Sequence, residues 1–533
     1  MSAPHYSDLW QAIALREPDR VAIITRDDRM TWGRFASEAG ALARHLDEES
    51  GLGFREAAAI LLYNRPEYLT FTWACLARGI APVAINYRYR AQEVRDLLLD
   101  SDSQVLLVST SLGAIAAEAA EGLDIEIITV DDGGEPLPGA TRYADIIAAG
   151  GRMPREAPRG AELRLYTGGT TGAPKAVVWD LDTLLVARQQ STWGLVGIPT
   201  PTSLDEAVAV AVSPLTPHPV TLPLSPLLHG TAQSTTMGTL ALGGTIALHA
   251  SAHMDIEEAY RLAMDTKATR LIVAGDALAL PLAEVAEQRG GLPHVDTILS
   301  SGMRFSDDVK RRLHALGDLA IIDMLASSEG GPFAFGITRS ADDLPARLVL
   351  TPGAVLLDED LNEITIEPDA LGILAYRGIL PREYYGDPEK TAKTFLQIRG
   401  HRYVMPGDWA RARGDGTIEL LGRLSAVVNT GGEKVFPAEV EEALLEHPSV
   451  DDVVVFGLPD LRFGEVVSAM VSPAPGAAID VADLLRFVDA RLAGYKKPRH
   501  IFVRPSLERT ATGKIELARV KEEAVRELQQ AKQ

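Results

Sequence analysis

The chain has 533 residues, more than one hydrophobic core usually serves, so we expect two or more domains. Hydrophobic residues make up 46% of it and charged residues 23%, the ordinary balance of a globular protein. The formal net charge of −21 argues against a surface that binds nucleic acid or an anionic membrane.

The single cysteine, Cys75, lies in an apolar run, where core filling is its most ordinary role. One thiol rules out an internal disulfide and a cysteine-based metal cluster, which is typical of a reducing compartment. The N-terminus lacks a basic region followed by an apolar core, and the apolar residues 207–228 are interrupted by prolines. We therefore expect a cytoplasmic protein without an integral membrane segment.

Strand and helix signals alternate through the first third of the chain. Residues 21–25 predict a strand, and Phe35, Ala39, Leu42 and Leu46 recur at the spacing of one helix face. The later signals in this region predict a helix at 66–77 and strands at 58–63, 82–85, 105–108 and 125–130. Such alternation predicts an α/β domain with mostly parallel sheets covered by helices.

The pattern changes near the C-terminus. Residues 411–420 predict a hairpin built on an Asp-Gly turn. Beyond Arg423, the signals predict a compact α+β unit with a helix after Pro437, strands at 453–456 and 466–471, and a helix from Val481. We therefore expect a large N-terminal domain of residues 1–423 and a small C-terminal domain of residues 424–533.

The segment that carries most chemical information is residues 166–176, Tyr-Thr-Gly-Gly-Thr-Thr-Gly-Ala-Pro-Lys-Ala. Its glycines and threonines let the backbone bend tightly and aim amides and hydroxyls at an anion. Lys175 adds a cation suited to phosphate. A Walker-type P-loop is excluded, because Ala173 and Pro174 separate Gly172 from Lys175. Taken alone, the segment is also compatible with a solvent-exposed linker.

This loop resembles the phosphate-binding signature of the acyl-adenylate-forming superfamily, which includes acyl-CoA ligases, luciferases and peptide-synthetase adenylation domains. Other segments between about residue 31 and residue 515 resemble the superfamily's motifs, in the same order: Leu228-His229-Gly230, Ser300-Ser301-Gly302-Met303, Leu325-Ala326-Ser327-Ser328-Glu329, 385–391, Gly407-Asp408-Trp409, Gly422-Arg423, 431–437 and 510–515. One match is weak evidence, but so many in order are strong. The chain is therefore identified as a member of this superfamily.

The resemblance implies an ATP site built from the glycine-rich loop and later motifs. The residues that would contact ATP are Thr167, Gly168, Gly169, Thr170, Gly172, Lys175, Ser301, Gly302, Ser327, Ser328, Asp408 and Arg423. Glu329, together with Thr170, would hold Mg²⁺, which prefers hard oxygen ligands. Asp408 offers two acceptor oxygens to the two ribose hydroxyls, and Arg423 offers a permanent cation.

The resemblance also implies two half-reactions, with the small domain rotating between them. In the first, the acid is adenylated and pyrophosphate leaves; the residues with implied catalytic roles are Lys514, Glu329, Thr171 and His229. In the second, the thiol of coenzyme A attacks the acyl-adenylate. The residues implied to line the approach of that thiol are Asn429, Gly431 and Gly432.

Four residues are implied to border the acyl group: His229, Met303, Leu325 and Ala326. Leu325 and Ala326 replace the tyrosine and glycine that are usual in the family. A bulky aromatic residue at the position of Ala326 marks acetate-specific members, so the methyl group here implies a site that is open past the first carbons. Residues 273–277, 300–302 and 327–329 resemble bacterial ligases for medium-to-long fatty acids and steroid side-chain acids.

The expected function is that of an ATP-dependent ligase that joins a medium-to-large carboxylic acid to coenzyme A, with Mg²⁺ as cofactor. An enzyme that loads the acyl group onto a separate carrier protein is the nearest alternative. A non-catalytic nucleotide-binding protein on the same fold is a second alternative. We expect no nucleic-acid partner, and the sequence leaves open whether the protein forms a homo-oligomer.

Overall fold

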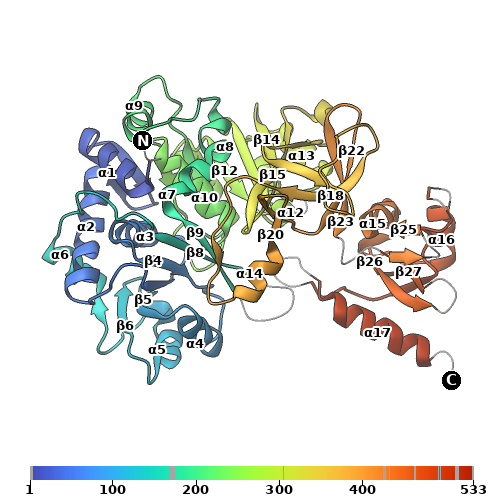
Figure 1. The fold of residues 1–533 in the computed structure, drawn as a ribbon, viewed down its shortest axis with the longest axis horizontal. Helices are drawn as coiled ribbons and strands as arrows, with labels where there is room; N and C mark the ends of the chain where they lie inside the picture. Colours follow the sequence, from blue (N-terminus) through green and yellow to red (C-terminus); the bar gives the residue numbers. More distant parts are fainter. Residues whose placement is uncertain are drawn as a thin grey trace. The chain divides into compact units, whose positions relative to one another are not determined.

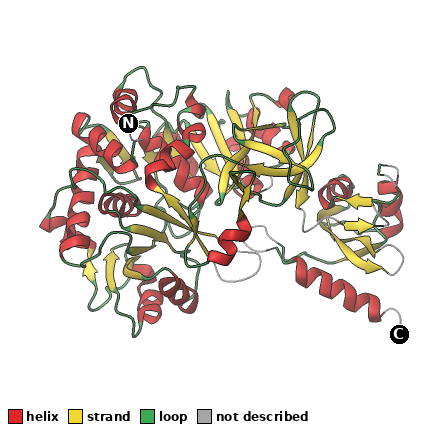
Figure 2. Cartoon of the chain, in the orientation of Figure 1, coloured by secondary structure: helices red, strands yellow, loops and turns green. Residues whose placement is uncertain are grey.

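The computed structural model describes residues 4–167, 175–303, 305–423, 428–430, 433–460, 464–489, 491–492, 494–509 and 515–530. The chain forms two compact units. The first comprises Met1–Arg347, Thr351–Gly353 and Arg377–Val404, and the second comprises Leu348–Leu350, Ala354–Tyr376 and Met405–Gln533. In both units, helices pack against the faces of β-sheets (Figures 1 and 2). Among the described residues, no helix is long and apolar enough to cross a membrane.

One sheet of the first unit has the strand order β19-β9-β8-β4-β3-β5-β6-β7. Its strands are β3 (Ala57–Leu61), β4 (Ala81–Ala84), β5 (Ser103–Ser109), β6 (Glu126–Val130), β7 (Thr141–Arg142), β8 (Glu162–Thr167), β9 (Lys175–Asp180) and β19 (Glu383–Tyr384). Neighbouring strands in the series β8-β4-β3-β5-β6-β7 are parallel. The β8–β9 and β9–β19 pairs are antiparallel. The helices α4 (Ala91–Asp100) and α5 (Gly113–Ala120) lie beside this sheet (Figure 1). Their apolar side chains pack in one buried cluster with those of its strands.

The other sheet of the first unit runs in the order β2-β1-β11-β10-β12-β13-β14-β15. Its strands are β1 (Val21–Ile24), β2 (Arg29–Thr31), β10 (Val220–Pro223), β11 (Thr245–Ala247), β12 (Arg270–Val273), β13 (Thr297–Ser301), β14 (Ala320–Ser327) and β15 (Gly330–Thr338). The pairs from β1 to β14 are parallel, whereas the β1–β2 and β14–β15 pairs are antiparallel.

The two faces of this second sheet bury different clusters, because side chains alternate along a strand. Leu271, Ile298 and Ile321 pack with α11 (Ile256–Asp265), α12 (Gly275–Arg289) and α13 (Asp307–His314). Their sequence neighbours on β12, β13 and β14 pack instead with Ala232 of α10 (Gly230–Ala241).

Local signals explain where the remaining helices of the first unit lie. For example, α3 (Pro66–Arg78) begins with proline in its first turn and ends at Gly79, whose φ of 71° favours glycine. The other elements of this unit are α1 (Tyr6–Arg16), α2 (Trp32–Glu48), α6 (Tyr143–Ala149), α7 (Leu181–Ala187), α8 (Gln189–Thr192), α9 (Leu204–Val212), α14 (Pro388–Thr394), β20 (Phe395–Ile398) and β21 (His401–Val404), with 3₁₀ turns at Thr110–Leu112, Gly194–Val196 and Ala341–Asp343.

The second unit begins with antiparallel strands in the order β16-β23-β22-β18, and β17 pairs with β18. These strands are β16 (Leu348–Leu350), β17 (Ala354–Leu357), β18 (Leu371–Tyr376), β22 (Asp408–Ala412) and β23 (Thr417–Arg423). The hairpin of β22 and β23 confirms the prediction made from the Asp-Gly turn. The sequence did not predict the other three strands.

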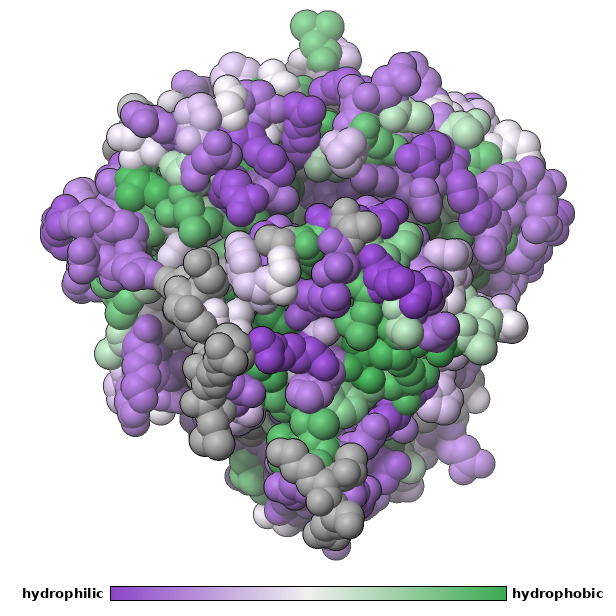
Figure 3. All heavy atoms as spheres, turned by 90° about the vertical axis from the view of Figure 1, so that its right-hand side faces the viewer, coloured by the Kyte–Doolittle hydropathy of each residue, from purple (hydrophilic) through white to green (hydrophobic). Residues whose placement is uncertain are grey.

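The described residues of the second unit also form a five-stranded sheet and three helices. They are β24 (Val428–Thr430), β25 (Glu433–Val435), β26 (Val450–Asp460), β27 (Gly464–Pro473), β28 (His500–Val503), α15 (Pro437–Leu445), α16 (Val481–Asp489) and α17 (Leu517–Gln530). Alternate residues of β26 serve two clusters: Val453 and Val455 face α15 and α16, whereas Val454 and Phe456 face α17. On the surface drawn in Figure 3, hydrophilic residues surround smaller hydrophobic areas, as on most protein surfaces.

These elements confirm the predicted fold class, a large α/β domain with a smaller α+β unit. The helices and strands predicted in the first third and beyond Pro437 are all present within a few residues of the predicted limits. The domain boundary between residues 423 and 424 stays a prediction, because residues 424–427 lie outside the described residues.

Candidate functional site

Several predicted site residues lie where parallel strands of the second sheet end. Ser301 is the last residue of β13, and Ser327 is the last residue of the neighbouring strand β14. Gly302 follows β13 with a φ of 79°, and no atom of the described residues lies within 4 Å of where its Cβ would be. Ligands of open α/β sheets bind outside the carboxyl ends of the strands. The structure therefore brings these residues, which are predicted to contact ATP, to the same edge of one sheet.

The predicted metal ligand Glu329 lies in the tight turn between β14 and β15. Ser327 pairs with Gly330 across this turn, and the Ser327 hydroxyl donates a 3.4 Å hydrogen bond to the Gly330 carbonyl. Ser328 and Glu329 form the tip of the turn, and both are half-buried. A short, hydrogen-bonded turn holds the carboxylate of Glu329 close to the end of the sheet.

One hydroxyl bonds to this carboxylate. The Tyr384 hydroxyl donates a hydrogen bond of 2.6 Å to Oε1 of Glu329. Burial is the largest cause that raises the pKa of Tyr384 above its ordinary value, and the nearby Glu329 carboxylate raises it further. The hydroxyl therefore keeps its proton and acts as a donor at neutral pH. Within the described part of the chain, no second hydrogen bond or ion pair to the Glu329 carboxylate is present.

The carboxylate environment fits Mg²⁺. This ion takes oxygen ligands and is usually held by one or two carboxylates together with substrate phosphates and water. Oε1 of Glu329 is occupied by a neutral donor, which leaves negative charge on the carboxylate for a cation. Among the described residues, no group of three or more histidine, cysteine, aspartate or glutamate side chains could hold a metal ion. The other ligands of the ion would therefore come from phosphate oxygens and water.

A second hydrogen bond connects the turn to the other sheet of the first unit. The indole Nε1 of Trp179 donates to the carbonyl oxygen of Ser328 at 3.0 Å. Trp179 lies on β9, the strand that begins at Lys175 directly after the glycine-rich loop. The turn that carries Glu329 is therefore joined to the strand that follows the predicted phosphate loop.

Lys175, the predicted phosphate cation, has a carboxylate partner. Its Nζ lies 3.0 Å from Oδ1 of Asp100, and the Tyr166 hydroxyl donates to Oδ2 of the same carboxylate at 2.9 Å. Both charged side chains are about one third exposed, so solvent screens this pair. Gly168, Gly169, Thr170, Thr171 and Gly172 lie outside the described residues, and Thr167 is placed as the end of β8.

The predicted acyl-site residues occupy different surroundings. Ala326 packs against the buried cluster formed by Ala232, Ile272, Leu299, Ile322 and Met324, together with Leu195 and Phe335. We call these residues the α10 cluster. Leu325 precedes Ala326 on β14 and pairs with Ala334. His229 is exposed at the N-cap of α10, and Met303 follows the glycine at the end of β13.

In the second unit, Asp408 and Arg423 stand opposite each other on β22 and β23. The register of this hairpin shifts between Trp409 and Ala410, and the shift places Asp408 opposite Arg423. Asn429 pairs with Lys434 between β24 and β25. Gly431, Gly432 and Lys514 lie outside the described residues.

Sequence reasoning missed three residues that contact the predicted site: Asp100, Trp179 and Tyr384. Tyr384 directly precedes the motif at residues 385–391, so an aromatic pair at 384–385 was a usable signal. Trp179 lies on the strand after the glycine-rich loop, but nothing in the spacing marks it. No local signal marks Asp100, which lies 75 residues before its lysine partner.

Known proteins match nearly the whole chain. A sequence model described as AMP-binding enzyme matches residues 10–380, and one described as AMP-binding enzyme C-terminal domain matches residues 439–514. The medium-chain acyl-CoA ligase Mig of Mycobacterium avium is 35% identical over 542 residues, which cover 97% of this chain and 97% of that protein. The medium/long-chain-fatty-acid–CoA/3-oxocholest-4-en-26-oate–CoA ligase of Mycobacterium marinum is 33% identical over 524 residues, which cover 95% of this chain and 94% of that protein.

Solved structures share the fold. The crystal structure of an anthranilate CoA ligase in complex with anthranoyl-AMP superposes with a TM-score of 0.79 at 21% identity, covering 98% of each chain. At this identity, the likeness establishes the architecture of the chain rather than its chemistry.

Proposed function

The chain belongs to the AMP-binding enzyme family, and from this membership we propose that it is an AMP-forming acyl-CoA ligase for a medium-to-large carboxylic acid. The relatives at 33–35% identity are ligases that form acyl-CoA, and they match this chain over 95–97% of its length. We also propose that the enzyme is cytoplasmic, since its single cysteine is buried and has no partner cysteine.

One observation supports this function most directly. The turn that carries Glu329 is hydrogen-bonded through Ser328 to Trp179, on the strand that starts at Lys175. A carboxylate suited to a divalent cation and a lysine suited to phosphate are thereby held by one connected piece of structure. ATP complexed with Mg²⁺ is the ligand whose charges need both groups.

In the proposed first half-reaction, a carboxylate oxygen of the acid attacks the α-phosphorus of ATP. The new bond is a carboxylic–phosphoric anhydride, and the bond to pyrophosphate breaks. The proposed role of Lys514 is to bring its ammonium between the acid and the α-phosphate, where two anions would otherwise repel each other. Mg²⁺, when bound, would neutralise phosphate charge and polarise the α-phosphate. Asp408 and Arg423 hold the ribose, and Glu329 contributes the carboxylate for the cation.

In the proposed second half-reaction, the thiolate of coenzyme A attacks the acyl carbon, and the bond to AMP breaks. AMP is a far better leaving group than the oxide that a free carboxylate would have to expel, so the anhydride makes the thioester accessible. We propose that residues 424–533 rotate between the two half-reactions, and that Asn429, Gly431 and Gly432 line the path of the thiol.

The proposed substrate class rests on Ala326 and on the names of the relatives. The M. avium relative is a medium-chain ligase, and the M. marinum relative is named for fatty and steroid side-chain acids. The Ala326 methyl group packs against the apolar α10 cluster, so an acyl chain entering there meets hydrocarbon. Each buried methylene contributes about 0.8 kcal/mol. We therefore expect acids several carbons longer than acetate to be preferred in kcat/KM.

A pyrophosphate-release screen tests this function. The enzyme is incubated with Mg·ATP and a series of short, aromatic, fatty and steroidal acids, with and without coenzyme A. We expect acid-dependent pyrophosphate release for medium or larger acids, with multiple turnovers only when coenzyme A is present. Pyrophosphate release without any acyl-CoA product would instead favour a carrier protein as acceptor. Acetate as the best acid would contradict the proposed substrate class.

A substitution at Gly432 separates the second half-reaction from the first. A leucine side chain in the proposed thiol path displaces the attacking sulfur, and a misplacement of about 1 Å costs roughly 10²-fold in rate. We expect Gly432→Leu to retain acid-dependent ATP–pyrophosphate exchange while acyl-CoA formation falls by about that factor.

The matched control is Gly494→Leu in the same unit. In the described part of the chain, no atom lies within 4 Å of where the Cβ of Gly494 would be, and its φ is outside the left-handed region, so both half-reactions should keep the parent rate. If Gly432→Leu forms acyl-CoA as fast as this control, the loop does not line the thiol path.

A further inference from the structure

We propose that Tyr384 is a positioning residue, whose hydroxyl fixes the carboxylate of Glu329 in the orientation that receives the metal ion of Mg·ATP. The inference rests on the proposed function, because it assumes that Glu329 is the carboxylate that holds the cation. It is carried by the 2.6 Å hydrogen bond from the Tyr384 hydroxyl to Oε1 of Glu329.

The backbone of Tyr384 is held firmly by its surroundings. Tyr384 ends β19, which pairs with β9 through the contacts Glu383 to Val178 and Tyr384 to Val177. The Tyr384 amide donates a 2.9 Å hydrogen bond to the Thr391 hydroxyl. Only 3% of the Tyr384 surface is exposed. The phenol therefore reaches Glu329 from a fixed strand rather than from a mobile loop.

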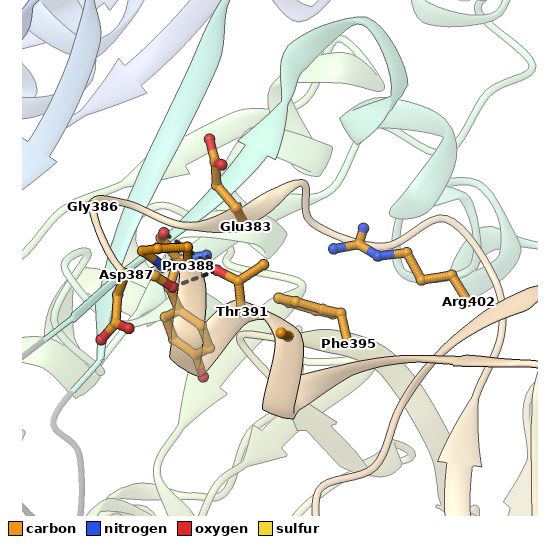
Figure 4. Close-up of a pocket in the computed structure, with 9 residues that line it drawn as sticks. Glu383, Gly386, Asp387, Pro388, Thr391, Phe395 and Arg402 are labelled. Atoms are coloured by element: carbon orange, nitrogen blue, oxygen red, sulfur yellow. Dashed lines mark hydrogen bonds between the residues drawn. The ribbon is translucent and has the colours of Figure 1, made fainter.

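The ring of Tyr384 is also held from the side of α14. The Lys390 ammonium lies 4.0 Å from the ring centroid, and the Phe395 ring lies 6.0 Å away. Tyr384 lines a cavity of about 320 Å³, whose other walls come from residues near α14 and from Arg402 (Figure 4). Because the cavity leaves one part of the Tyr384 environment open, the contacts with Lys390 and Phe395 determine the position of the ring.

Two neighbouring strands thus hold the same turn at two points. Trp179 of β9 bonds to the Ser328 carbonyl, and Tyr384 of β19 bonds to the Glu329 side chain. The first bond fixes the backbone of the turn, and the second removes the rotational freedom of the carboxylate. Within the described residues, no other group bonds to this carboxylate, so the phenol is the hydrogen-bond donor there that orients it.

The expected size of the effect follows from the behaviour of groups that orient metal ligands. Removing such a partner typically lowers metal affinity by about 10–100-fold. We therefore expect Tyr384→Phe, which removes the hydroxyl and keeps the ring, to reduce the gain in ATP affinity that Mg²⁺ provides by about 10-fold or more. ATP binding in the absence of Mg²⁺ should change little.

The matched control is Tyr385→Phe. Tyr385 is the adjacent residue, and its hydroxyl donates a 2.9 Å hydrogen bond to a different carboxylate, Oδ2 of Asp102. The two substitutions remove the same atom and the same type of bond one residue apart. Only the change at Tyr384 should alter the response to Mg²⁺.

The experiment is isothermal titration calorimetry of the parent and both variants with ATP, in excess Mg²⁺ and in excess EDTA. The expected result is a Mg²⁺-dependent affinity gain that is lost in Tyr384→Phe and retained in Tyr385→Phe. Equal gains in all three proteins, or equal losses in the two variants, would overturn the proposal. A parent protein that binds ATP equally with and without Mg²⁺ would overturn it as well.

A second readout separates positioning from a general structural role. Thioester formation from a supplied acyl-adenylate does not use ATP or its metal, so Tyr384→Phe should keep the parent rate in that step. A variant that is slowed equally in both half-reactions would identify a structural role and overturn the proposal. Because the calorimetric measurement needs no acid and no turnover, it can succeed even if the proposed acyl-CoA ligase activity is not found.

Discussion

Replacing Lys514 by alanine should slow adenylation by about 10²–10³-fold and leave thioester formation from a supplied acyl-adenylate near the parent rate. The cation is needed where the incoming carboxylate meets the triphosphate, since both are anions and negative charge develops at the α-phosphate. Once the anhydride has formed and pyrophosphate has left, that need is gone. ATP–pyrophosphate exchange measures the first step, and coenzyme A with synthetic acyl-adenylate measures the second.

Lys521 provides the control for this substitution. It lies on α17, a few residues beyond Lys514 in the sequence, and carries the same charge. Lys521→Ala should leave both half-reactions unchanged. If Lys514→Ala is equally slow in both steps, or if both alanine variants behave alike, Lys514 does not act specifically in adenylation.

Replacing Ala326 by tryptophan should remove most activity on a medium or larger acid and spare whatever activity exists on acetate. The indole would fill space beside the α10 cluster, which is buried and closely packed. Excluding about four methylenes, at about 0.8 kcal/mol each, corresponds to about 3 kcal/mol, or roughly a 200-fold fall in kcat/KM. Steady-state kinetics on acids of increasing length would show the loss growing with chain length.

An overpacked variant can also fail to fold, so Ala326→Leu is measured beside it. The smaller side chain should reduce activity on long acids by a lesser factor, and calorimetric binding of Mg·ATP should show that both variants keep a working nucleotide site. If Ala326→Trp binds Mg·ATP and still accepts the large acid at the parent rate, the acyl chain does not pass Ala326.

Many elements of the fold could be predicted because residues at their ends, such as proline, glycine and turn residues, mark where they begin and end. Pro66 and Gly79 mark the two ends of α3, and the turn at Asp415 and Gly416 centres the hairpin of β22 and β23. The strands β16 and β18 pair with β23 and β22, which come much later in the chain, so no local signal specifies that pairing. The register shift after Trp409, which sets Asp408 opposite Arg423, likewise depends on how the strands meet.

The residues of the candidate site likewise fall into those that the sequence could predict and those that it could not. Its motif residues could be identified because each lies in a short segment with a recognisable order, such as the turn at 327–329. The partners of those residues could not, because they come from elsewhere in the chain. Tyr384 lies 55 residues after Glu329, and Asp100 lies 75 residues before Lys175. Only the folded arrangement of the two sheets brings such pairs together, and no spacing rule encodes them.

The most direct test of an acyl-adenylate route follows an oxygen atom. The preferred acid is labelled with oxygen-18 in its carboxylate and converted by the enzyme with Mg·ATP and coenzyme A, and the nucleotide product is analysed by mass spectrometry. Attack of the carboxylate on the α-phosphorus predicts that one labelled oxygen appears in AMP and none in pyrophosphate. Label in inorganic phosphate with ADP as the nucleotide product, or AMP without label, would contradict the account.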